Sequence, residues 1–265
     1  MSIRRGDLLV LMLLLLMISV YPGCSREQES TLARIRDAGE ISAAMSADYP
    51  PFNYLIESGE LEGFDVDVVL ELAGRLGVTP KIVIKKWSGI IEGLLAGEYD
   101  IILGSMAISE ERLKLVSFSI PYYHSEVRVV VREGSGMQDL DDLKGKTVGI
   151  GAGSNYENDA RALGAADIRF FDPWTKGLLE LQKGNLHAVI IDQIVGIHAV
   201  EFGKFKIQFL GPPLRREVVA IAVRKEDKRL LKAINSAVLS MQKDGFLAEL
   251  GRKMARCEYD CSGRF

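Results

Sequence analysis

Short apolar runs alternate with amphipathic segments along most of this chain, and this alternation limits the folds that it can adopt. The apolar runs have strand character and fall at 41–45, 81–84, 100–103, 127–131, 147–150, 168–171, 188–191 and 218–223. Helix-like segments lie between them. In the clearest one, apolar residues of 66–76 share one helix face, Asp65 is the predicted N-cap and Gly77 lies just past the end. The alternation predicts an α/β architecture with largely parallel sheets.

An internal similarity suggests two related halves. The segment 89–105, GIIEGLLAGEYDIILGS, resembles the segment 176–192, KGLLELQKGNLHAVIID. Each combines an amphipathic helix, a glycine stop and an apolar strand that ends in a small or polar residue. If the segments are equivalent parts of two lobes, Ser105 and Asp192 lie at matching strand ends and face one cleft. The alternative is that any helix–glycine–strand unit has this pattern.

The segment 97–123 is the most informative one for function. Small residues follow its strand, namely Gly104, Ser105, Ala107 and Ser109. In an open α/β sheet, ligands bind at such strand ends, and small residues leave room and expose backbone N–H groups. Arg112 follows, and an arginine can bind a carboxylate through two parallel hydrogen bonds. The alternative is a surface ion pair of Arg112 with Glu110 or Glu111.

Further motifs follow the same order and spacing as in a known protein family. They are DYPPF at 48–52, EGFDVDVV at 62–69, KGKTVGIGAGS at 144–154 and LQKGNLHAVIID at 181–192. With these motifs the chain resembles the family 3 extracellular solute-binding proteins, the amino-acid-binding components of ABC importers. The resemblance runs from about residue 32 to about residue 252. It implies the α/β two-lobe periplasmic binding protein fold (type II), in which two Rossmann-like lobes are joined by a two-crossover hinge.

The resemblance also implies the limits of the lobes. The crossovers fall near 125–129 and near 216–220. The predicted boundaries are 1–23 for a signal peptide, 24–126 and 218–265 for a discontinuous lobe 1, and 127–217 for lobe 2.

The resemblance assigns the two charged groups of an amino-acid ligand to residues of this chain. Arg112 binds the ligand carboxylate, helped by Ser105. The glycine-rich turn with Ser154 and Asn155 opens a helix, so its N–H groups can bind the same anion. Asp192 binds the ligand ammonium; the alternative is an N-cap for the following helix, and it can do both. The predicted ligand-binding residues are Asp48, Tyr49, Phe52, Trp87, Ser105, Ala107, Arg112, Ser154, Asn155 and Asp192.

Aromatic rings and one carboxylate surround the predicted side-chain end of the ligand. Tyr49, Phe52 and Trp87 form aromatic walls, and the alternative for Phe52 and Trp87 is an ordinary core position. Asp48 precedes the Tyr–Pro–Pro–Phe turn and is expected to reach the ligand side chain. Ala107 departs from the family pattern, which usually has Ser or Thr there, so it offers only its backbone N–H. Losing that hydroxyl costs on the order of 1 kcal/mol of binding.

The first residues have the features of a bacterial targeting segment. Arginines precede the apolar run 8–20, which spans about 20 Å as a helix and is short of the roughly 30 Å of a bilayer core. Gly23 and Cys24 resemble a lipoprotein cleavage site, although Tyr21 and Pro22 depart from the usual pattern. We expect a lipid on Cys24 that anchors the protein to a membrane in the periplasm. Ordinary signal cleavage is the alternative.

Composition excludes some partners and cofactors. The formal net charge is -3 and there is no basic stripe, so nucleic acid is not expected as a partner. Cys257 and Cys261 can pair in an oxidising periplasm. They can also begin a metal site, but no second pair and no nearby histidine complete it. Neither a metal nor another cofactor is therefore expected, and we expect a monomer.

The sequence favours a binding protein over an enzyme. We expect the chain to capture a polar L-amino acid by hinge closure and to deliver it to an ABC transporter permease in the inner membrane. The alternative on the same scaffold is a periplasmic dehydratase of the prephenate or arogenate type, which needs a positioned general acid. Asp48 and Glu157 are acids in the right region. The histidines His124, His187 and His198 are scattered, and no nucleophile–base arrangement accompanies them.

Overall fold

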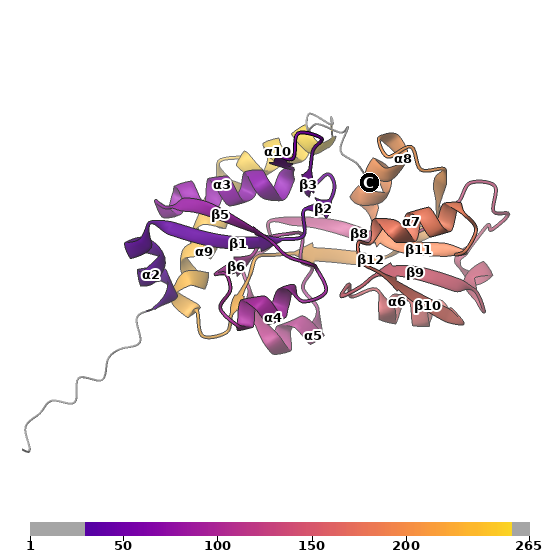
Figure 1. Cartoon of the computed structure of the whole chain (residues 1–265), viewed down its shortest axis with the longest axis horizontal. Helices are drawn as coiled ribbons and strands as arrows, with labels where there is room; N and C mark the ends of the chain where they lie inside the picture. The colour runs from indigo at the N-terminus through magenta and orange to yellow at the C-terminus, as the bar shows by residue number, and fades with distance from the viewer. Residues whose placement is uncertain (1–29, 256–265) are drawn as a thin grey trace, which may run out of the picture. The chain divides into compact units, whose positions relative to one another are not determined.

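Two five-stranded sheets form the framework of the described chain. The computed structural model describes residues 30–255, and Figure 1 shows helices on both sides of the sheets. The first sheet has the strand order β5 (Thr79–Ile84), β1 (Glu40–Met45), β6 (Ile101–Ile102), β13 (Ala222–Arg224) and β7 (Val116–Phe118). The second has the order β10 (Asp167–Phe171), β9 (Thr147–Gly151), β11 (Ala188–Asp192), β8 (Tyr123–Arg132) and β12 (Ile207–Val219). A small antiparallel sheet joins β2 (Asp48–Tyr49), β3 (Asn53–Leu55) and β4 (Leu61–Glu62).

The α/β architecture expected from the sequence is confirmed, and the sheets are mixed rather than largely parallel. In the first sheet β5, β1 and β6 run parallel, whereas β13 pairs antiparallel with β6 and β7. In the second sheet β10, β9 and β11 run parallel, whereas β8 pairs antiparallel with β11 and β12. The parallel strands are those that alternate with helices in the sequence. The antiparallel strands lie where the chain passes from one sheet to the other.

The chain passes between the two sheets twice. It leaves the first sheet after β7 and enters the second at β8, and it returns from β12 to β13. The sequence predicts one strand at 218–223, and this prediction is wrong because the chain changes sheets there. β12 ends at Val219 and β13 begins at Ala222. Between them, the Ile221 N–H donates to the Ser119 hydroxyl oxygen over 3.0 Å instead of joining a strand ladder.

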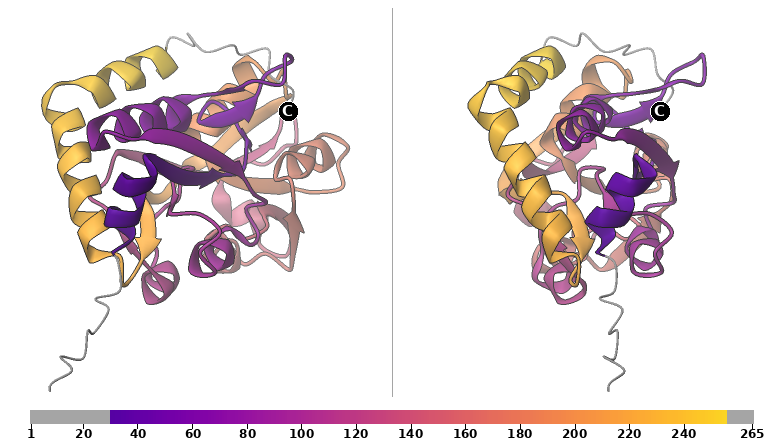
Figure 2. Two further views of the ribbon diagram at one scale, coloured as in Figure 1. Left: turned by 60° about the vertical axis from the view of Figure 1, so that its left-hand side comes forward. Right: turned by 90° about the vertical axis from the view of Figure 1, so that its left-hand side faces the viewer.

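Helices cover both faces of each sheet. They are α2 (Thr31–Ala38), α3 (Phe64–Leu76), α4 (Ile90–Leu95), α5 (Glu110–Leu115), α6 (Glu157–Ala162), α7 (Thr175–Gln182), α8 (Gln193–Glu201), α9 (Lys228–Lys243) and α10 (Phe246–Ala255), with a 3-10 turn at Leu140–Leu143. Figure 2 shows α9 and α10 bent around α3. Side chains of β1 alternate between the faces: Ala43 and Met45 join the core cluster that contains α3 residues, whereas Ala44 joins the α4 cluster. Burial on both faces explains why the strands are continuous apolar runs.

The internal similarity seen in the sequence corresponds to equivalent positions in the two sheets. α4 precedes β6, which lies next to β1, and α7 precedes β11, which lies next to β9. Asp100 accepts a hydrogen bond from the Ser42 N–H over 2.9 Å, and His187 Nδ1 accepts one from the Thr147 N–H over 3.2 Å. Both side chains therefore bind the backbone near the start of the neighbouring strand. His187 is a structural residue, as its alignment with Asp100 indicates.

The start of α3 depends on a glycine. Gly63, not Asp65, is the N-cap, so the cap predicted from the sequence is wrong. Gly63 has φ of 126°, and a Cβ atom at this position would lie 2.3 Å from the carbonyl oxygen of Phe52, which only glycine avoids. Asp65 lies in the first turn of the helix, after Phe64, and its carboxylate binds side chains near the cavity described below. At the other end, Gly77 adopts the left-handed conformation and confirms the predicted end of the helix.

No helix within residues 30–255 is long and apolar enough to span a membrane. Several predictions from the sequence concern other parts of the chain. The signal peptide at 1–23, the lipidation of Cys24 and the pairing of Cys257 with Cys261 all lie outside the described residues.

Candidate functional site

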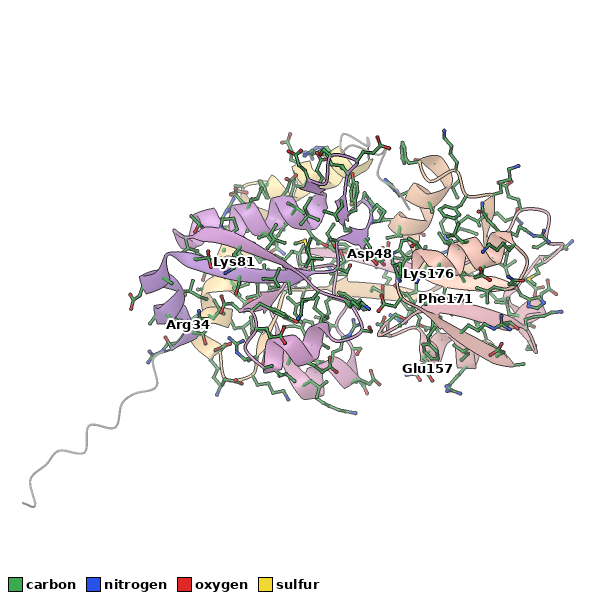
Figure 3. All side chains as sticks on the ribbon, in the orientation of Figure 1. Arg34, Asp48, Lys81, Glu157, Phe171 and Lys176 are labelled. Carbon is green, nitrogen blue, oxygen red and sulfur yellow. The ribbon has the colours of Figure 1, made fainter. Side chains whose placement is uncertain are left out.

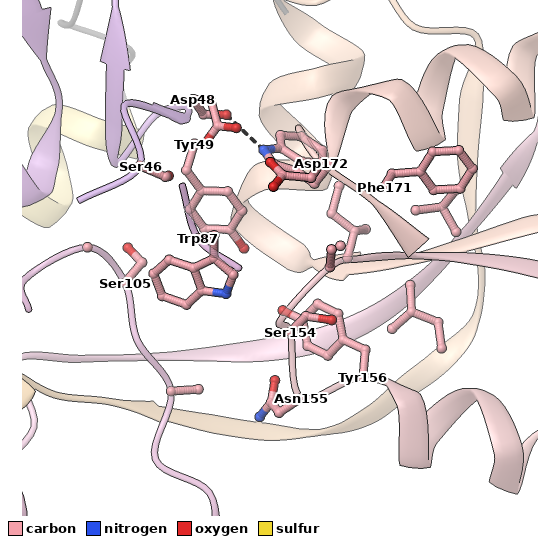
Figure 4. Close-up of a pocket in the computed structure, with 18 of the residues that line it drawn as sticks. Ser46, Asp48, Tyr49, Trp87, Ser105, Ser154, Asn155, Tyr156, Phe171 and Asp172 are labelled. Atoms are coloured by element: carbon pink, nitrogen blue, oxygen red, sulfur yellow. Dashed lines mark hydrogen bonds between the residues drawn. The ribbon is translucent and has the colours of Figure 1, made fainter. Parts of the chain in front are cut away.

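A cavity lies between the two sheets, at strand ends that come from both. Its lining follows β1, β6, β9 and β10 at their carboxyl ends (Figure 4). Open α/β sheets bind ligands at this kind of position. The cavity has a volume of about 80 Å³, and a single water molecule needs about 10–15 Å³. It therefore has room for a small polar molecule.

Most of the predicted ligand-binding residues line this cavity. They are Asp48, Tyr49, Trp87, Ser105, Ala107, Arg112, Ser154 and Asn155. They come from segments that are far apart in the sequence and belong to both sheets. Phe52 and Asp192 are not part of the lining.

Arg112 is a buried cation in the wall of the cavity. Only 7% of its surface is exposed. Its guanidinium donates to the carbonyl oxygen of Ala107 over 2.8 Å and to that of Gly153 over 3.1 Å. The guanidinium carbon also lies 5.5 Å from the centre of the Trp87 ring, a favourable cation–π distance. These contacts fix the direction of the guanidinium from both sides of the cavity.

The surroundings of Arg112 suit an anionic ligand. Within residues 30–255 Arg112 has no ion-pair partner. The alternative of a surface ion pair with Glu110 or Glu111 is therefore wrong, because both glutamates are exposed whereas Arg112 is buried. Burial lowers the pKa of Arg112, which reflects the cost of taking a guanidinium out of water. A ligand carboxylate would offset that cost through charge-assisted hydrogen bonds.

Ser105 has an uncommon backbone conformation at the cavity. Its φ is 59°, in the left-handed region that residues other than glycine rarely adopt. The Ser105 N–H donates to the Tyr122 hydroxyl oxygen over 3.1 Å, and the Ser105 hydroxyl donates to Asp65 over 2.8 Å. Both donors of Ser105 are therefore used within the protein. Its hydroxyl oxygen is the group left to contact a ligand.

The glycine-rich turn after β9 forms another part of the wall. Gly153 has φ of 78°, and a Cβ atom there would lie 3.2 Å from the Cα atom of Ser88. The hydroxyl oxygen of Ser154 is buried and makes no hydrogen bond within the described part of the chain. The Asn155 side chain donates to Glu217 over 3.1 Å. The Ser154 hydroxyl therefore keeps its hydrogen-bonding capacity for a ligand.

Carboxylates lie at another end of the cavity. Figure 4 shows Asp48 and Asp172 close to Tyr49 and well separated from Asn155. Burial raises the pKa of Asp48, and the charge of Asp172 also raises it. Trp174 Nε1 donates to the Asp48 carbonyl oxygen over 2.8 Å, and its ring lies edge-on to Tyr49. A further negative charge is unfavourable at this end, whereas a cation or a neutral donor is favourable.

Phe52 and Asp192 lie behind the wall of the cavity. Phe52 is fully buried and stacks on Tyr49 and Tyr123, at centroid distances of 5.7 Å and 4.9 Å. Its surroundings are those of an ordinary core position, which was the alternative to a ligand contact. Asp192 is buried and accepts hydrogen bonds from backbone N–H groups at the start of α8, so its N-cap role is confirmed. Burial raises the pKa of Asp192 to about 7. Its contact with a ligand ammonium stays a prediction.

The sequence does not identify several lining residues. Those with polar or aromatic side chains are Ser46, Tyr156, Phe171, Asp172, Trp174 and Glu217. Asp172 and Trp174 come directly after β10, so the strand-end rule applied to Ser105 also indicates them. Glu217 lies inside β12, which continues to Val219, and it follows neither a strand end nor a glycine-rich turn. No sequence signal points to it.

The acids and histidines considered for an enzyme do not come together in the described residues. Glu157 binds Arg161 within α6, does not line the cavity and lies away from Asp48 in Figure 3. His124 is exposed, and burial lowers the pKa of His198 to about 4. Among residues 30–255, no group of three or more His, Cys, Asp or Glu side chains could bind a metal ion.

Comparison with known proteins agrees with this fold and cavity. The sequence model of the bacterial extracellular solute-binding proteins, family 3, matches residues 41–255. The L-cystine-binding protein TcyJ of Escherichia coli (strain K12) is 33% identical over 228 residues, which cover 85% of this chain and 86% of TcyJ. The L-arginine-binding protein of Pseudomonas aeruginosa is 34% identical over 218 residues, which cover 77% of this chain and 83% of that protein.

A solved structure is similar over the same region. The crystal structure of an ArgBP mutant from T. maritima has a TM-score of 0.80 and 36% sequence identity, and the match covers 85% of this chain and 99% of that one. Together with the two helix-covered sheets, these matches confirm the expected two-lobe fold. The similar proteins are named as binding proteins rather than enzymes, which agrees with the expectation of a non-enzyme.

Proposed function

Because the chain belongs to the bacterial extracellular solute-binding proteins, family 3, we propose that it captures a polar L-amino acid and delivers it to the permease of an ABC importer. One observation carries this proposal: the buried guanidinium of Arg112 and several carboxylates line one cavity between the two sheets. An amino acid has a carboxylate and an ammonium on one carbon, so its charges match such a cavity. Relatives that are named for binding L-cystine and L-arginine support the ligand class.

The lobes of this proposal follow the two sheets, with β8 and β12 as the hinge. Lobe 1 comprises 24–126 and 218–265, and lobe 2 comprises 127–217. The hydrogen bonds of Trp174 with Asp48 and of Ser88 with Asp172, both 2.8 Å, join the two sides across the cavity. Closure of this kind excludes water from the ligand and strengthens its ion pairs. The permease then recognises the closed form.

The lining charges favour a ligand whose side chain is polar and not acidic. Among residues 30–255, Arg112 is the one cation that lines the cavity, and Asp48, Asp172 and Glu217 are the anions that line it. An acidic side chain near Asp48 would meet like charge in a poorly hydrated cleft. A cationic or neutral donor would satisfy Asp48, and its apolar stem can lie on the ring of Tyr49. A purely apolar side chain would leave Asp48 desolvated without a partner.

A thermal-shift screen of the mature protein against the common amino acids and L-cystine tests the proposed function. Arginine, lysine, histidine and glutamine should raise the melting temperature more than glutamate and aspartate do, because binding to the native state alone stabilises it. Calorimetry of the strongest responders gives their affinities. If glutamate or aspartate binds about tenfold tighter than the polar, non-acidic set, the assignment of the side-chain end is wrong. If no amino acid binds, the proposed function is wrong.

The second part of the proposal is a lipid anchor on Cys24. Gly23 and Cys24 follow the apolar run 8–20, and more than one acyl chain gives stable anchoring. The full-length protein expressed in a bacterial host should partition with membranes. Cys24→Ala should release it or leave it unprocessed. An intact mass that corresponds to unmodified mature protein would rule out the lipid and leave ordinary signal cleavage.

A further inference from the structure

Two carboxylates from opposite sides of the cavity lie at its side-chain end. Asp48 follows β1 of the first five-stranded sheet, and Asp172 follows β10 of the second. Both line the cavity, and Figure 4 shows them beside Tyr49 and away from Asn155. Asp48 is half-buried and Asp172 is exposed. The pair therefore extends from the interior of the cavity towards solvent.

The charges of these two carboxylates are not compensated by a bound cation within residues 30–255. Glu217, the third anion of the lining, pairs with Arg215 over 3.1 Å. Lys176 donates to the backbone carbonyl oxygen of Asp172 over 3.2 Å rather than to its carboxylate. Burial raises the pKa of Asp48, and the charge of Asp172 raises it as well, as expected for like charges that lie close together. A ligand cation would relieve this repulsion.

Aromatic rings beside the two carboxylates favour the same kind of group. Trp174 lies edge-on to Tyr49 with a centroid distance of 5.6 Å, and both residues line the cavity. Gly151 makes room for Trp174, because a Cβ atom at this glycine would lie 3.3 Å from the Trp174 Cβ atom. The faces of Trp and Tyr rings attract cations, so a cationic side chain gains from the rings as well as from the carboxylates.

Each of these aspartates is also held by a residue from the other side of the cavity. Ser88, which follows β5 of the first sheet, donates its hydroxyl hydrogen to Asp172 Oδ2 over 2.8 Å. Trp174, which follows β10 of the second sheet, donates from Nε1 to the Asp48 carbonyl oxygen over 2.8 Å. Separating the two sides of the cavity breaks both bonds. The arrangement of the two aspartates is therefore complete only when the cavity is closed.

Arg112 provides an independent reason to expect a charged ligand in this cavity. Its side chain lines the cavity, only 7% of its surface is exposed, and it has no ion-pair partner in the part of the chain that the structure describes. Among residues 30–255, the charged residues that line the cavity are one cation and three anions. A zwitterionic amino acid leaves this negative excess unchanged, whereas an amino acid with a cationic side chain reduces it.

We infer that Asp48 and Asp172 together bind a cationic group on the ligand side chain, so that the cavity selects basic amino acids over neutral ones of the same length. The inference rests on the proposed function, which also admits a neutral polar side chain, and narrows it. Because the two carboxylates come from opposite sides of the cavity, the bound cation joins them. A ligand that gains contacts only in the closed form stabilises that form.

Calorimetry with L-arginine and L-citrulline tests this inference. The two amino acids have the same length and the same α-groups, but a neutral ureido group replaces the guanidinium in citrulline. The ratio of their affinities therefore reports on the side-chain end, because contacts with Arg112 cancel. Both are measured on the wild type, Asp48→Asn, Asp172→Asn and the double variant. Asp167→Asn is the matched control, because Asp167 is an exposed aspartate of β10 that pairs with Arg169 and does not line the cavity.

The wild type and Asp167→Asn should bind arginine at least about tenfold tighter than citrulline. Asp48→Asn and Asp172→Asn should each lower this ratio about threefold, and the double variant should lower it to about threefold or less. The affinity for citrulline should change by less than about threefold in all variants. A general disturbance of the cavity would instead weaken both probes equally. A wild-type ratio in the double variant overturns the inference.

The wild-type protein separates failure of the inference from failure of the proposed function. If amino acids bind but arginine binds no tighter than citrulline, the inference is wrong and the proposed function stands. If no amino acid of the screen binds, both are wrong.

Ser88→Ala and Trp174→Phe test whether closure completes the arrangement. Each variant keeps both carboxylates and removes one hydrogen bond that crosses the cavity. The ratio of arginine to citrulline affinity should fall by about twofold to threefold in each. Ser88 and Asp172 are exposed, so their variants retain the fold even if Asp48→Asn does not unfold cooperatively. Unchanged ratios in Ser88→Ala and Trp174→Phe overturn the role of closure.

Discussion

Replacement of Arg112 by Met should weaken amino-acid binding by about 30-fold to several thousand-fold, since truncating one partner of a buried charge pair costs about 2–5 kcal/mol. The guanidinium is buried and directed by hydrogen bonds to Ala107 and Gly153. It has no ion-pair partner in the part of the chain that the structure describes, so its charge remains available to a ligand carboxylate. Isothermal titration calorimetry with the tightest amino acid of the screen measures the loss.

The same substitution should leave the melting temperature of the ligand-free protein within a few degrees of the wild type. Removing Arg112 forfeits two hydrogen bonds to backbone carbonyls, but it also removes the desolvation cost of a buried cation. Met has a similar length and can fill the space. If Arg112 binds the ligand, Arg112→Met loses affinity and keeps its melting temperature. If Arg112 were needed for the fold, the melting temperature would fall as well.

Arg161→Met is the matched control for Arg112→Met. Arg161 is exposed and binds Glu157 within α6, and such surface pairs contribute little to stability. The control should keep wild-type affinity. Wild-type affinity in Arg112→Met, or a large loss in the control, would contradict the role of Arg112 as the carboxylate-binding residue.

The parts of the site that follow strand ends could be predicted from the sequence. Ser105, Arg112 and the turn with Ser154 come after apolar runs, and the structure brings them to one cavity because parallel strands present their carboxyl ends at the same edge. The helix–glycine–strand similarity likewise predicts equivalent positions in two sheets. Local sequence carries these signals because each depends on a strand and the few residues after it.

Other features could not be predicted because they depend on pairing between distant segments. Glu217 lies inside a strand and enters the cavity only because β12 pairs with β8 beside Asn155 and Tyr156. Phe52 has an aromatic side chain of the kind that often packs against a ligand. In the structure, Tyr49 and Tyr123 stack on its ring and bury it in the core. The run 218–223 has strand character throughout, and only the change of sheet divides it.

Asp65 is a buried carboxylate that hydrogen-bonds to core side chains and to Ser105, which lines the cavity. It accepts hydrogen bonds from the Tyr122 hydroxyl over 2.7 Å, the Asn53 side chain over 2.7 Å and the Ser105 hydroxyl over 2.8 Å. These bonds join β3, α3 and the residue directly before β8 with the segment after β6. They also stabilise the left-handed backbone of Ser105 at the cavity. The sequence suggests an N-cap for Asp65 because it reports only local helix signals.

Asp65→Ala should lower the free energy of unfolding by about 3 kcal/mol or more, because it leaves three buried donors without an acceptor at about 1–3 kcal/mol each. For a domain of this size that corresponds to a fall in melting temperature of roughly 6–12 °C. Chemical denaturation measures the loss. Asp67→Ala is the control on the same helix: Asp67 pairs with Lys253 nearer the surface, so it should cost about 1 kcal/mol or less.

The cost of Asp65→Ala should also depend on pH. Burial raises the pKa of Asp65 to about 6, despite hydrogen bonds that lower it. An unfolded aspartate titrates near 3.9, so between about pH 4 and pH 6 the native state retains a proton that the unfolded state has lost, and stability falls as the pH rises through this window. The variant lacks this contribution, whereas Asp192 and the other carboxylates remain in both proteins. The penalty for Asp65→Ala should therefore be larger at pH 4.5 than at pH 7.5, by on the order of 2 kcal/mol. Equal penalties at the two pH values would show that Asp65 keeps an ordinary pKa in the folded protein and that burial does not dominate its titration.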